Sequence, residues 1–429
     1  MAQLSLKPAR LRQRNRARVL LEIYKGHAVT RTQIAEVLGL SVMALTRIVR
    51  ELVTAGLVEE GPKSTLNPLG RPSTKLALSG AGGYVVGLSL SAYEPCVSLV
   101  NIRGELVLRR QIELDSLRKA QDAIAASVRV IQKLIADAGI PPRRVLGLGT
   151  VVSGVVDNRK GVVLAAPYLG WDSADIASPL QRMLGLPVVV ENLSNALLVA
   201  EVRFGIAAGK RSVLLFRSAA GLGGSLWIDG RLIRGPHFRA GWQISHMRIK
   251  GKTRVCSCGQ MGCLNTVSSG SAVITDLGLG ASRVKSGRST ASPIPSWSYL
   301  DKIRKLLDQV CRAAVDGDAR TNQVLFRAGR CLGEASLGLL TAVDAEQIIL
   351  AGPLSTCASY QNGFKFGLSQ GYPIASDLVA LSTMDHGYAA ALLALSELVL
   401  SDHLAFDRLQ EENDTKLREA YEEILEVEL

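Results

Sequence analysis

The sequence predicts an α/β protein that carries a separate, mostly helical segment at its N-terminus. The chain has 429 residues, 47% of them hydrophobic, so it can bury a sizeable core but is too long for one ordinary domain. Helical spacing of apolar residues dominates residues 1–80, whereas strand-like runs alternate with helical ones from Gly83 onward. We therefore expect two or three domains, with the first over residues 1–80.

The N-terminal segment is strongly basic. Residues 1–80 contain 13 Lys and Arg against 5 Asp and Glu, and residues 401–429 contain 3 against 10. A first helix is expected from Arg10 to Tyr24, because its apolar residues share one stripe and its arginines lie mostly off it. A basic segment of this kind favours binding to nucleic-acid phosphates, whereas the acidic tail is typical of a solvated surface.

Two further helices are joined by a short turn. Thr30 can cap a helix from Arg31 to Leu38, which Gly39 ends. Ser41 can cap the next helix, from Val42 to about Ala55. A turn of about three residues between two short helices predicts a helix-turn-helix, whose second helix enters the major groove of DNA.

The second of these helices has one apolar face and one polar face. Leu45, Ile48, Val49 and Leu52 are expected in the core. The other face would meet base edges or phosphates, and Arg31 begins the preceding helix. The candidate DNA-binding residues of this unit are Arg31, Ser41, Met43, Ala44, Thr46, Arg47 and Arg50.

A β-hairpin wing is expected after the third helix. Its strands are predicted at residues 57–60 and 75–78, and residues 61–69 are rich in turn-forming residues. The tripeptide at 70–72 precedes the second strand, where a short cationic finger suits a narrow A·T-rich minor groove. We therefore add three residues to the candidate DNA-binding set: Gly70, Arg71 and Pro72.

The remaining chain has the alternating strand and helix patterns that are typical of an α/β fold. Residues 84–90, 96–102 and 105–113 predict a meander of strands, followed by a helix from Gln121 to Ala138. Later strands at 145–152 and 188–191 precede a helix from Ser194 to Phe204, and residues 282–298 are expected to form a surface loop.

A cluster of cysteines predicts a metal site. Cys256, Cys258 and Cys263 with His246 offer three thiolates and one imidazole, a normal ligand set for tetrahedral zinc. Four protein ligands leave no open position for activated water, so we expect a structural Zn²⁺ rather than a catalytic one. The other cysteines each stand alone among apolar or small residues and are expected as core thiols: Cys96, Cys311, Cys331 and Cys357.

From about residue 10 to residue 400 the chain resembles the ROK family, which contains repressors and bacterial sugar kinases. The zinc signature from His246 to Leu264 carries the resemblance most specifically. Supporting matches lie at residues 152–157, 169–171, 190–192, 269–270 and 349–352. The winged helix ending in Gly-Arg-Pro points to the repressor branch.

The resemblance implies a particular architecture. The expected fold is a winged helix-turn-helix followed by a two-lobed, actin-like ATPase domain of the ROK sugar-kinase type. We expect the winged helix over residues 1–80 and the first lobe over 81–198, completed by C-terminal helices at about 385–429. The second lobe, with the zinc site, is expected over 199–384.

Two positions argue against kinase activity. Family kinases carry an Asp-x-Gly-Gly-Thr phosphate loop, and the aligned stretch here ends in Ser91-Ala92-Tyr93, without the carboxylate or the glycines. Their catalytic aspartate follows an asparagine, whereas Asn192 is followed here by Leu193, which cannot accept a proton. We therefore expect no enzymatic activity, and we interpret the glycine-rich turn at residues 220–225 as hairpin geometry.

Ligand binding by the kinase-like domain is also altered. Family members bind sugar through two glutamates near the zinc ligands, and this chain has Gln243 and Asn265 there. The candidate effector-binding residues are Asn192, Gln243, His246 and Asn265. Both amides can form hydrogen bonds, but charge-assisted recognition of an ordinary hexose is weakened.

The sequence thus predicts a bacterial DNA-binding transcriptional regulator, most simply a repressor of carbohydrate-related genes. Its partners would be a double-stranded DNA operator, a small carbohydrate-like effector and a second copy, as a homodimer or a dimer of dimers. The alternatives are a constitutive DNA-binding protein without an effector and an active sugar kinase with a DNA-binding head. The chain lacks a signal-peptide core and a membrane span, so a cytoplasmic location is expected.

Overall fold

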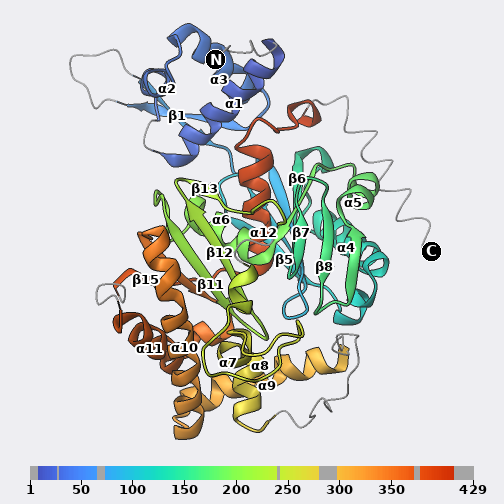
Figure 1. The fold of residues 1–429 in the computed structure, drawn as a ribbon. Coiled ribbons are helices and arrows are strands. Elements are labelled where there is room, and N and C mark those ends of the chain that lie inside the picture. The colour runs from blue at the N-terminus through green and yellow to red at the C-terminus, as the bar shows by residue number, and fades with distance from the viewer. Residues whose placement is uncertain are drawn as a thin grey trace.

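A computed structural model describes residues 8–26, 29–64, 73–238, 242–279, 297–371 and 377–409. A small N-terminal head lies at one end of two larger α/β lobes (Figure 1). The mixed α/β fold with a winged-helix head confirms the predicted fold class. No helix in the described ranges is long and apolar enough to cross a membrane.

The head is a winged helix-turn-helix. Thr30 accepts a hydrogen bond from Gln33 N in a capping box, and Gly39 ends the second helix with a φ of 64°. The predicted core residues of the third helix are buried. The elements are α1 (Pro8–Lys25), α2 (Arg31–Leu38), α3 (Val42–Thr54), β1 (Val58–Ser64) and β2 (Ser73–Leu78).

The wing strands are longer than the sequence predicted. The first strand was expected to stop at residue 60, but β1 continues to Ser64. Lys63 pairs with Thr74 and Ser64 with Ser73 beyond an irregularity in the register. Cross-strand pairing therefore overrides the local turn preference of Gly61 and Pro62. The predicted wing-tip residues Gly70, Arg71 and Pro72 lie outside the described residues.

The first lobe is built on a sheet of order β10-β6-β3-β4-β5, in which β3, β6 and β10 are parallel. Helices α4 and α5 pack with a smaller sheet of order β7-β8-β9 to form a separate hydrophobic core. The predicted meander is confirmed. The bounds are β3 (Tyr84–Leu90), β4 (Cys96–Asn101), β5 (Leu106–Gln111), α4 (Ala120–Asp137), β6 (Val145–Val152), β7 (Val155–Asp157), β8 (Val162–Ala166), β9 (Trp171–Asp175), α5 (Ala177–Leu184) and β10 (Val188–Asn192).

The second lobe repeats the strand order of the first. Its sheet runs β13-β12-β11-β14-β15, so in both lobes a meander is followed by two strands parallel to its first strand. The strand bounds are β11 (Val213–Ser218), β12 (Leu222–Ile228), β13 (Arg231–Leu232), β14 (Gln347–Ala351) and β15 (Val379–Leu381). The helix bounds are α7 (Asn265–Ser268), α8 (Gly270–Asp276), α9 (Trp297–Val315), α10 (Ala319–Val343) and α11 (Ala358–Ser369). Because α9 begins at Trp297, the end of the expected loop at 282–298 is helical, and its residues up to 296 lie outside the described ranges.

Two helices lie between the sheets of the lobes: α6 (Leu193–Phe204) and α12 (His386–Ala394), which continues as a π-helical turn at Leu395–Val399 (Figure 1). Helix α12 packs on the strands of the first lobe at two glycines. A Cβ at Gly87 would lie 2.0 Å from Gly387 O, and one at Gly149 would lie 2.0 Å from Ala390 O. Only glycine allows this close approach of helix and sheet. The remaining short turns are Leu114–Arg118, Pro142–Arg144, Trp242–His246, Pro353–Thr356 and Phe406–Leu409.

Polar and aromatic contacts attach the head to the first lobe. The Arg144 guanidinium donates to Ala55 O at 2.7 Å and to Gly82 O at 2.9 Å. Arg103 Nε donates to Leu78 O at 2.7 Å. The guanidinium of Arg16 lies 4.0 Å from the centre of a ring near the C-terminus, that of Phe406. These contacts set the position of the head relative to the lobes.

Candidate DNA interface, metal centre and cleft

Helix α3 presents a polar face to solvent. Met43 is 84% exposed, and Leu45 on the opposite face is fully buried. The Ser41 hydroxyl accepts a hydrogen bond from Ala44 N, so it caps the helix. The Thr46 hydroxyl donates to Val42 O at 2.7 Å. Each candidate on this face is exposed: Ser41, Met43, Ala44, Thr46, Arg47 and Arg50.

The carboxylate of Glu51 interacts with three arginines beside this face. Glu51 accepts hydrogen bonds from Arg12 and Arg16 on α1, and Arg47 Nε lies 3.7 Å from the same carboxylate. Burial opposes ionisation of Glu51, but the hydrogen bonds from the two α1 arginines outweigh it and lower the pKa of this carboxyl. Arg50 has no ion-pair partner among the described residues. The sequence showed these arginines but could not show that they share one counter-ion.

The basic surface extends from the head onto the first lobe. Arg12, Arg16, Arg47 and Arg50 line a cavity of about 1020 Å³ together with Arg143 and Arg144. Sequence reasoning missed the contribution of the first lobe, because Arg143 and Arg144 lie far along the chain from the four arginines of the head. The run of arginines off the apolar stripe of α1 was the only local signal.

Arg31 differs from the other candidates in the head. Its guanidinium pairs with Glu60 on β1, and its side chain is 25% exposed. A contact between Arg31 and a DNA phosphate would have to compete with this ion pair. The structure thus separates Arg31, which is paired across the domain, from Arg47 and Arg50, which extend from α3 into solvent.

The four predicted metal ligands come together. Their ligand atoms all lie within 4.8 Å of one another. Cys256 Sγ lies 3.7 Å from His246 Nδ1, and Cys258 Sγ lies 3.7 Å from Cys263 Sγ. Zn–S bonds of about 2.3 Å give a tetrahedral edge of about 3.8 Å, so these separations fit zinc. The three thiols and one imidazole also form a complete ligand set.

The remaining four cysteines were each expected to stand alone, but two of them are neighbours in the folded protein. Cys311 Sγ on α9 lies 3.3 Å from Cys357 Sγ, which precedes α11. These positions are far apart in the chain, and only the packing of the second lobe brings them together. Cys96 and Cys331 have no thiol neighbour of this kind among the described residues.

The two positions compared with kinase residues are held by Tyr93 and Leu193. Tyr93 follows β3, and its hydroxyl donates to Asp308 Oδ1 at 3.1 Å across to α9. Its ring lines a small cavity together with Ser91 and Ala92. Leu193, the first residue of α6, is fully buried in the core between the lobes.

A cleft of about 450 Å³ lies between the lobes, within the size range of small-molecule sites. Asn192, His246 and Asn265 line it, and the side chain of Gln243 lies outside the described residues. Two of the lining amides also support the fold. Asn192 Oδ1 caps α6, and Asn265 Oδ1 accepts a hydrogen bond from Leu222 N at 2.9 Å.

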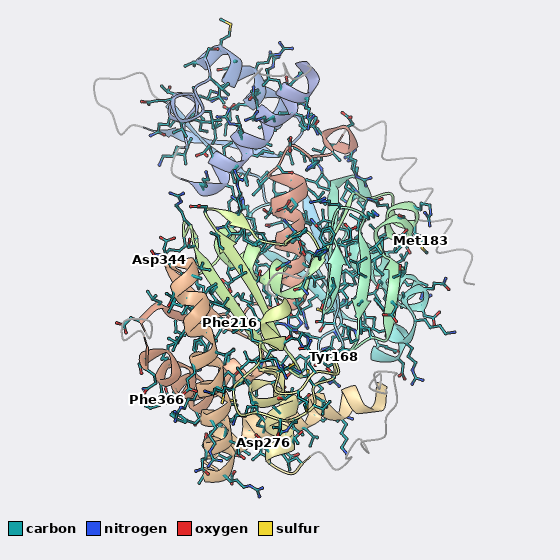
Figure 2. The ribbon with its side chains drawn as sticks, in the orientation of Figure 1. Tyr168, Met183, Phe216, Asp276, Asp344 and Phe366 are labelled. Atoms are coloured by element: carbon teal, nitrogen blue, oxygen red, sulfur yellow. The ribbon has the colours of Figure 1, made fainter. Side chains whose placement is uncertain are left out.

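Sequence reasoning missed two residues that line this cleft. Tyr168 precedes β9, and Arg217 lies on β11. Figure 2 labels Tyr168 on the first lobe and Phe216, the residue before Arg217, on the second. Neither residue belongs to a motif, and only the folded arrangement of the lobes brings them to one cleft.

Comparisons with known proteins agree with this geometry. The MarR family model matches residues 12–64, and the ROK family model matches residues 88–366. The chain is 27% identical to the xylose repressor of Caldicellulosiruptor bescii over 80% of this chain and 84% of that protein. It is 22% identical to the Escherichia coli K12 DNA-binding transcriptional dual regulator NagC over 80% of this chain and 82% of that one.

Solved structures show the same fold. A ROK family transcriptional regulator, a homologue of the E. coli MLC protein, superposes with a TM-score of 0.74 at 24% identity, covering 93% of this chain and 99% of that one. A ROK family glucokinase from Streptomyces griseus has a TM-score of 0.58 at 21% identity, covering 73% of this chain and 100% of that one. With its family match spanning more than half of its length and both lobes, this chain belongs to the ROK family.

Proposed function

We propose that this protein is a DNA-binding transcriptional regulator, a repressor of carbohydrate-related genes whose kinase-like lobes do not catalyse phosphoryl transfer. The exposed face of α3 carries the proposal: an apolar face packs into the head while arginines project from the other face. The relatives named as a xylose repressor and a DNA-binding transcriptional dual regulator support it over four-fifths of the chain.

The proposed reading of DNA divides the contacts between two grooves. Arg47 and Arg50 lie three residues apart on α3, so they can approach base edges or phosphates of one major groove. Arg71, which the sequence predicts at the tip of the wing, is assigned to an adjacent minor groove. Arg12, Arg16 and Arg143 line the same cavity as Arg47 and Arg50, and they would contact the DNA backbone beside α3. Such a head reads two half-sites as a homodimer or a dimer of dimers.

We assign residues 1–80 to the DNA-binding domain, 81–198 with about 385–429 to the first lobe, and 199–384 to the second lobe. A structural zinc ion on His246, Cys256, Cys258 and Cys263 would join the long loop after β13 to the start of α7. The lobes would then transmit effector binding to the spacing of the heads in the dimer.

Loss of kinase activity follows from two packed side chains in this proposal. By the resemblance, Tyr93 replaces a glycine of the phosphate loop of family kinases, and its hydroxyl donates a hydrogen bond to Asp308. Leu193 offers no carboxylate for general-base catalysis. A cleft of about 450 Å³ that lacks these groups suits an effector better than a substrate for phosphoryl transfer.

The test is selection of binding sites from random DNA by the full-length protein, followed by fluorescence anisotropy on the selected site. We expect salt-dependent, sequence-specific binding, and Arg50→Ala should weaken it by about 1–3 kcal/mol. Arg211→Ala is the matched control, because Arg211 is an exposed arginine of the second lobe that pairs with Asp229. Enrichment of no sequence, or equal losses for both variants, would contradict the proposal.

A further inference from the structure

Arg217 is a buried arginine on the side of the second lobe that faces the first. It lies on β11, where its neighbours in register are Gly223 on β12 and Ala351 on β14. The adjacent Phe216 points into the core of the second lobe, whereas Leu215 belongs to the core between the lobes. Because side chains alternate along a strand, Arg217 shares the face of Leu215 and points between the lobes. Only 9% of the residue is exposed.

Among the described residues, no carboxylate forms an ion pair with Arg217, and its Nε has no hydrogen-bond partner. Burial lowers the pKa of Arg217 to about 10, which still leaves the guanidinium charged at neutral pH. Burial, and then the nearby Arg217, lower the pKa of His386 to about 3, so this imidazole stays neutral. The carboxylates of Glu94 and Asp385 are paired with Arg109. Arg217 is therefore a buried cation without a counter-ion in this part of the protein.

A buried charge without a partner is costly, and natural proteins keep one where something else compensates it. The position of Arg217 shows where compensation can come from. Arg217, Ser153, Tyr168 and Gly221 line both the cleft between the lobes and the smaller cavity beside Tyr93. Arg217 thus stands where these two spaces meet.

Two glycines near Arg217 allow hydroxyl groups of the cleft to approach the strand backbone closely. Gly221 and Gly223 bring backbone rather than side chains to this wall of the cleft. A Cβ at Gly221 would lie 2.3 Å from the Tyr168 hydroxyl, and one at Gly223 would lie 2.4 Å from Ser194 Oγ. The hydroxyls of Ser153, Tyr168 and Ser194 line the same cleft. A planar guanidinium with nearby hydroxyls is suited to a carboxylate or a phosphate.

The other charged or metal-binding residues of the cleft differ from Arg217 in their exposure or in their position relative to the smaller cavity. The carboxylate of Asp172 also lines the cleft, but this residue is exposed, so solvent screens its charge. The metal ligands His246 and Cys258 line the cleft but not the smaller cavity that Arg217 also borders. Asn265 contributes a neutral amide. Arg217 is the buried charge among the described lining residues.

We propose that Arg217 binds the negatively charged group of a small polyhydroxylated effector, a carboxylate or a phosphate, in the cleft between the lobes. The proposal rests on the regulatory function proposed above, because it names the chemical class of the effector. The hydroxyls and amides along the cleft bind the uncharged part of the molecule. A neutral sugar of the same size lacks the group that compensates Arg217.

Isothermal titration of the full-length, zinc-containing protein tests this proposal without DNA. The probes are D-gluconate, D-glucose 6-phosphate, inorganic phosphate and neutral D-glucose. We expect at least one anionic sugar to bind at least tenfold more tightly than D-glucose, and the preferred one identifies carboxylate or phosphate as the recognised group. Binding by none of the three anions, or equal binding of D-glucose, would overturn the proposal.

Variants then assign the binding to Arg217. Arg217→Met should abolish anion binding, and Arg217→Lys, which keeps the charge but loses the planar pair of donors, should weaken it by about tenfold. The control Arg231→Met removes an exposed arginine from β13 of the same sheet and should change nothing. Anion binding that survives Arg217→Met would refute the assignment. If Arg217→Met does not fold, Arg217→Lys and Tyr168→Phe replace it as test variants, because both keep the positive charge at residue 217. Unchanged anion affinity in both variants would also refute the assignment.

Operator binding is measured separately for every variant. Arg217→Met should still bind DNA, because it lies in the second lobe, but addition of the anion should no longer change its DNA affinity. Absence of anion binding by the wild-type protein, with intact operator binding, would overturn this inference alone. Absence of operator binding by the wild-type protein would overturn the proposed function.

Discussion

Replacement of Glu51 by glutamine tests how the head balances stability against DNA binding. The carboxylate accepts hydrogen bonds from Arg16 at 2.7–2.8 Å, and the Arg16 side chain is only 15% exposed. Hydrogen bonds to charged groups contribute about 1.5–3 kcal/mol, and glutamine retains one acceptor oxygen. Glu51→Gln should therefore lower the free energy of local unfolding of α1 and α3 by about 1–2 kcal/mol.

The same change should strengthen binding to DNA. Removal of the negative charge frees Arg12, Arg16 and Arg47 for phosphates, so the slope of log K against log salt should become steeper by about 1. Hydrogen exchange measures the first effect, and fluorescence anisotropy across a salt series measures the second. Glu36→Gln is the control, because Glu36 is exposed on α2 and has no ion pair among the described residues.

The stability effect of Glu51 should depend on pH in one direction. The hydrogen bonds from Arg12 and Arg16 lower the pKa of Glu51 below its ordinary value of 4.5 despite its partial burial. The stabilisation is therefore complete above that value and is lost as the pH falls through the lowered pKa of the folded protein. Equal stability of Glu51→Gln and wild type at pH 7, or an unchanged salt slope, would refute this reasoning.

Further predictions concern the metal, the lost chemistry and the wing. Elemental analysis should find about one zinc ion per chain, and Cys258→Ala should lose it together with thermal stability; metal-free wild-type protein would contradict the ligand assignment. A coupled assay with ATP and hexoses should show no turnover by wild type or by Leu193→Asp, because Tyr93 still fills the phosphate loop; turnover by wild type would show that the kinase is active. Arg71→Ala should weaken binding more on operators with A·T flanks than on matched operators with G·C flanks, and equal losses would leave Arg71 as a phosphate contact only.

Local signals made the head predictable from the sequence. Thr30, Gly39 and Ser41 act within one turn of the chain, so the helices and their ends follow from neighbouring residues. The metal ligands were found for the same reason, because Cys256, Cys258 and Cys263 lie close together and His246 precedes them by ten residues. Patterns of this kind depend little on the rest of the fold.

Features that depend on distant packing were not predictable. No sequence motif marks Arg217 as a binding residue. Its position in the cleft follows only from the way the two lobes pack. The contact of Cys311 with Cys357 and the shared use of Glu51 by α1 and α3 likewise join separate elements. The length of β1 was underestimated because strand pairing outweighed the preferences of Gly61 and Pro62.

Methylation protection of guanine N7 on a selected operator tests most directly whether α3 reads the major groove. Guanine N7 lies in that groove, so a bound arginine shields it. We predict protection by the wild-type protein in two half-sites about 10 base pairs, or a multiple of one helical turn, apart. Arg50→Ala or Arg47→Ala should lose protection at one base pair of each half-site. Binding at full affinity with every guanine N7 still reactive would contradict the assignment of α3 as the recognition helix.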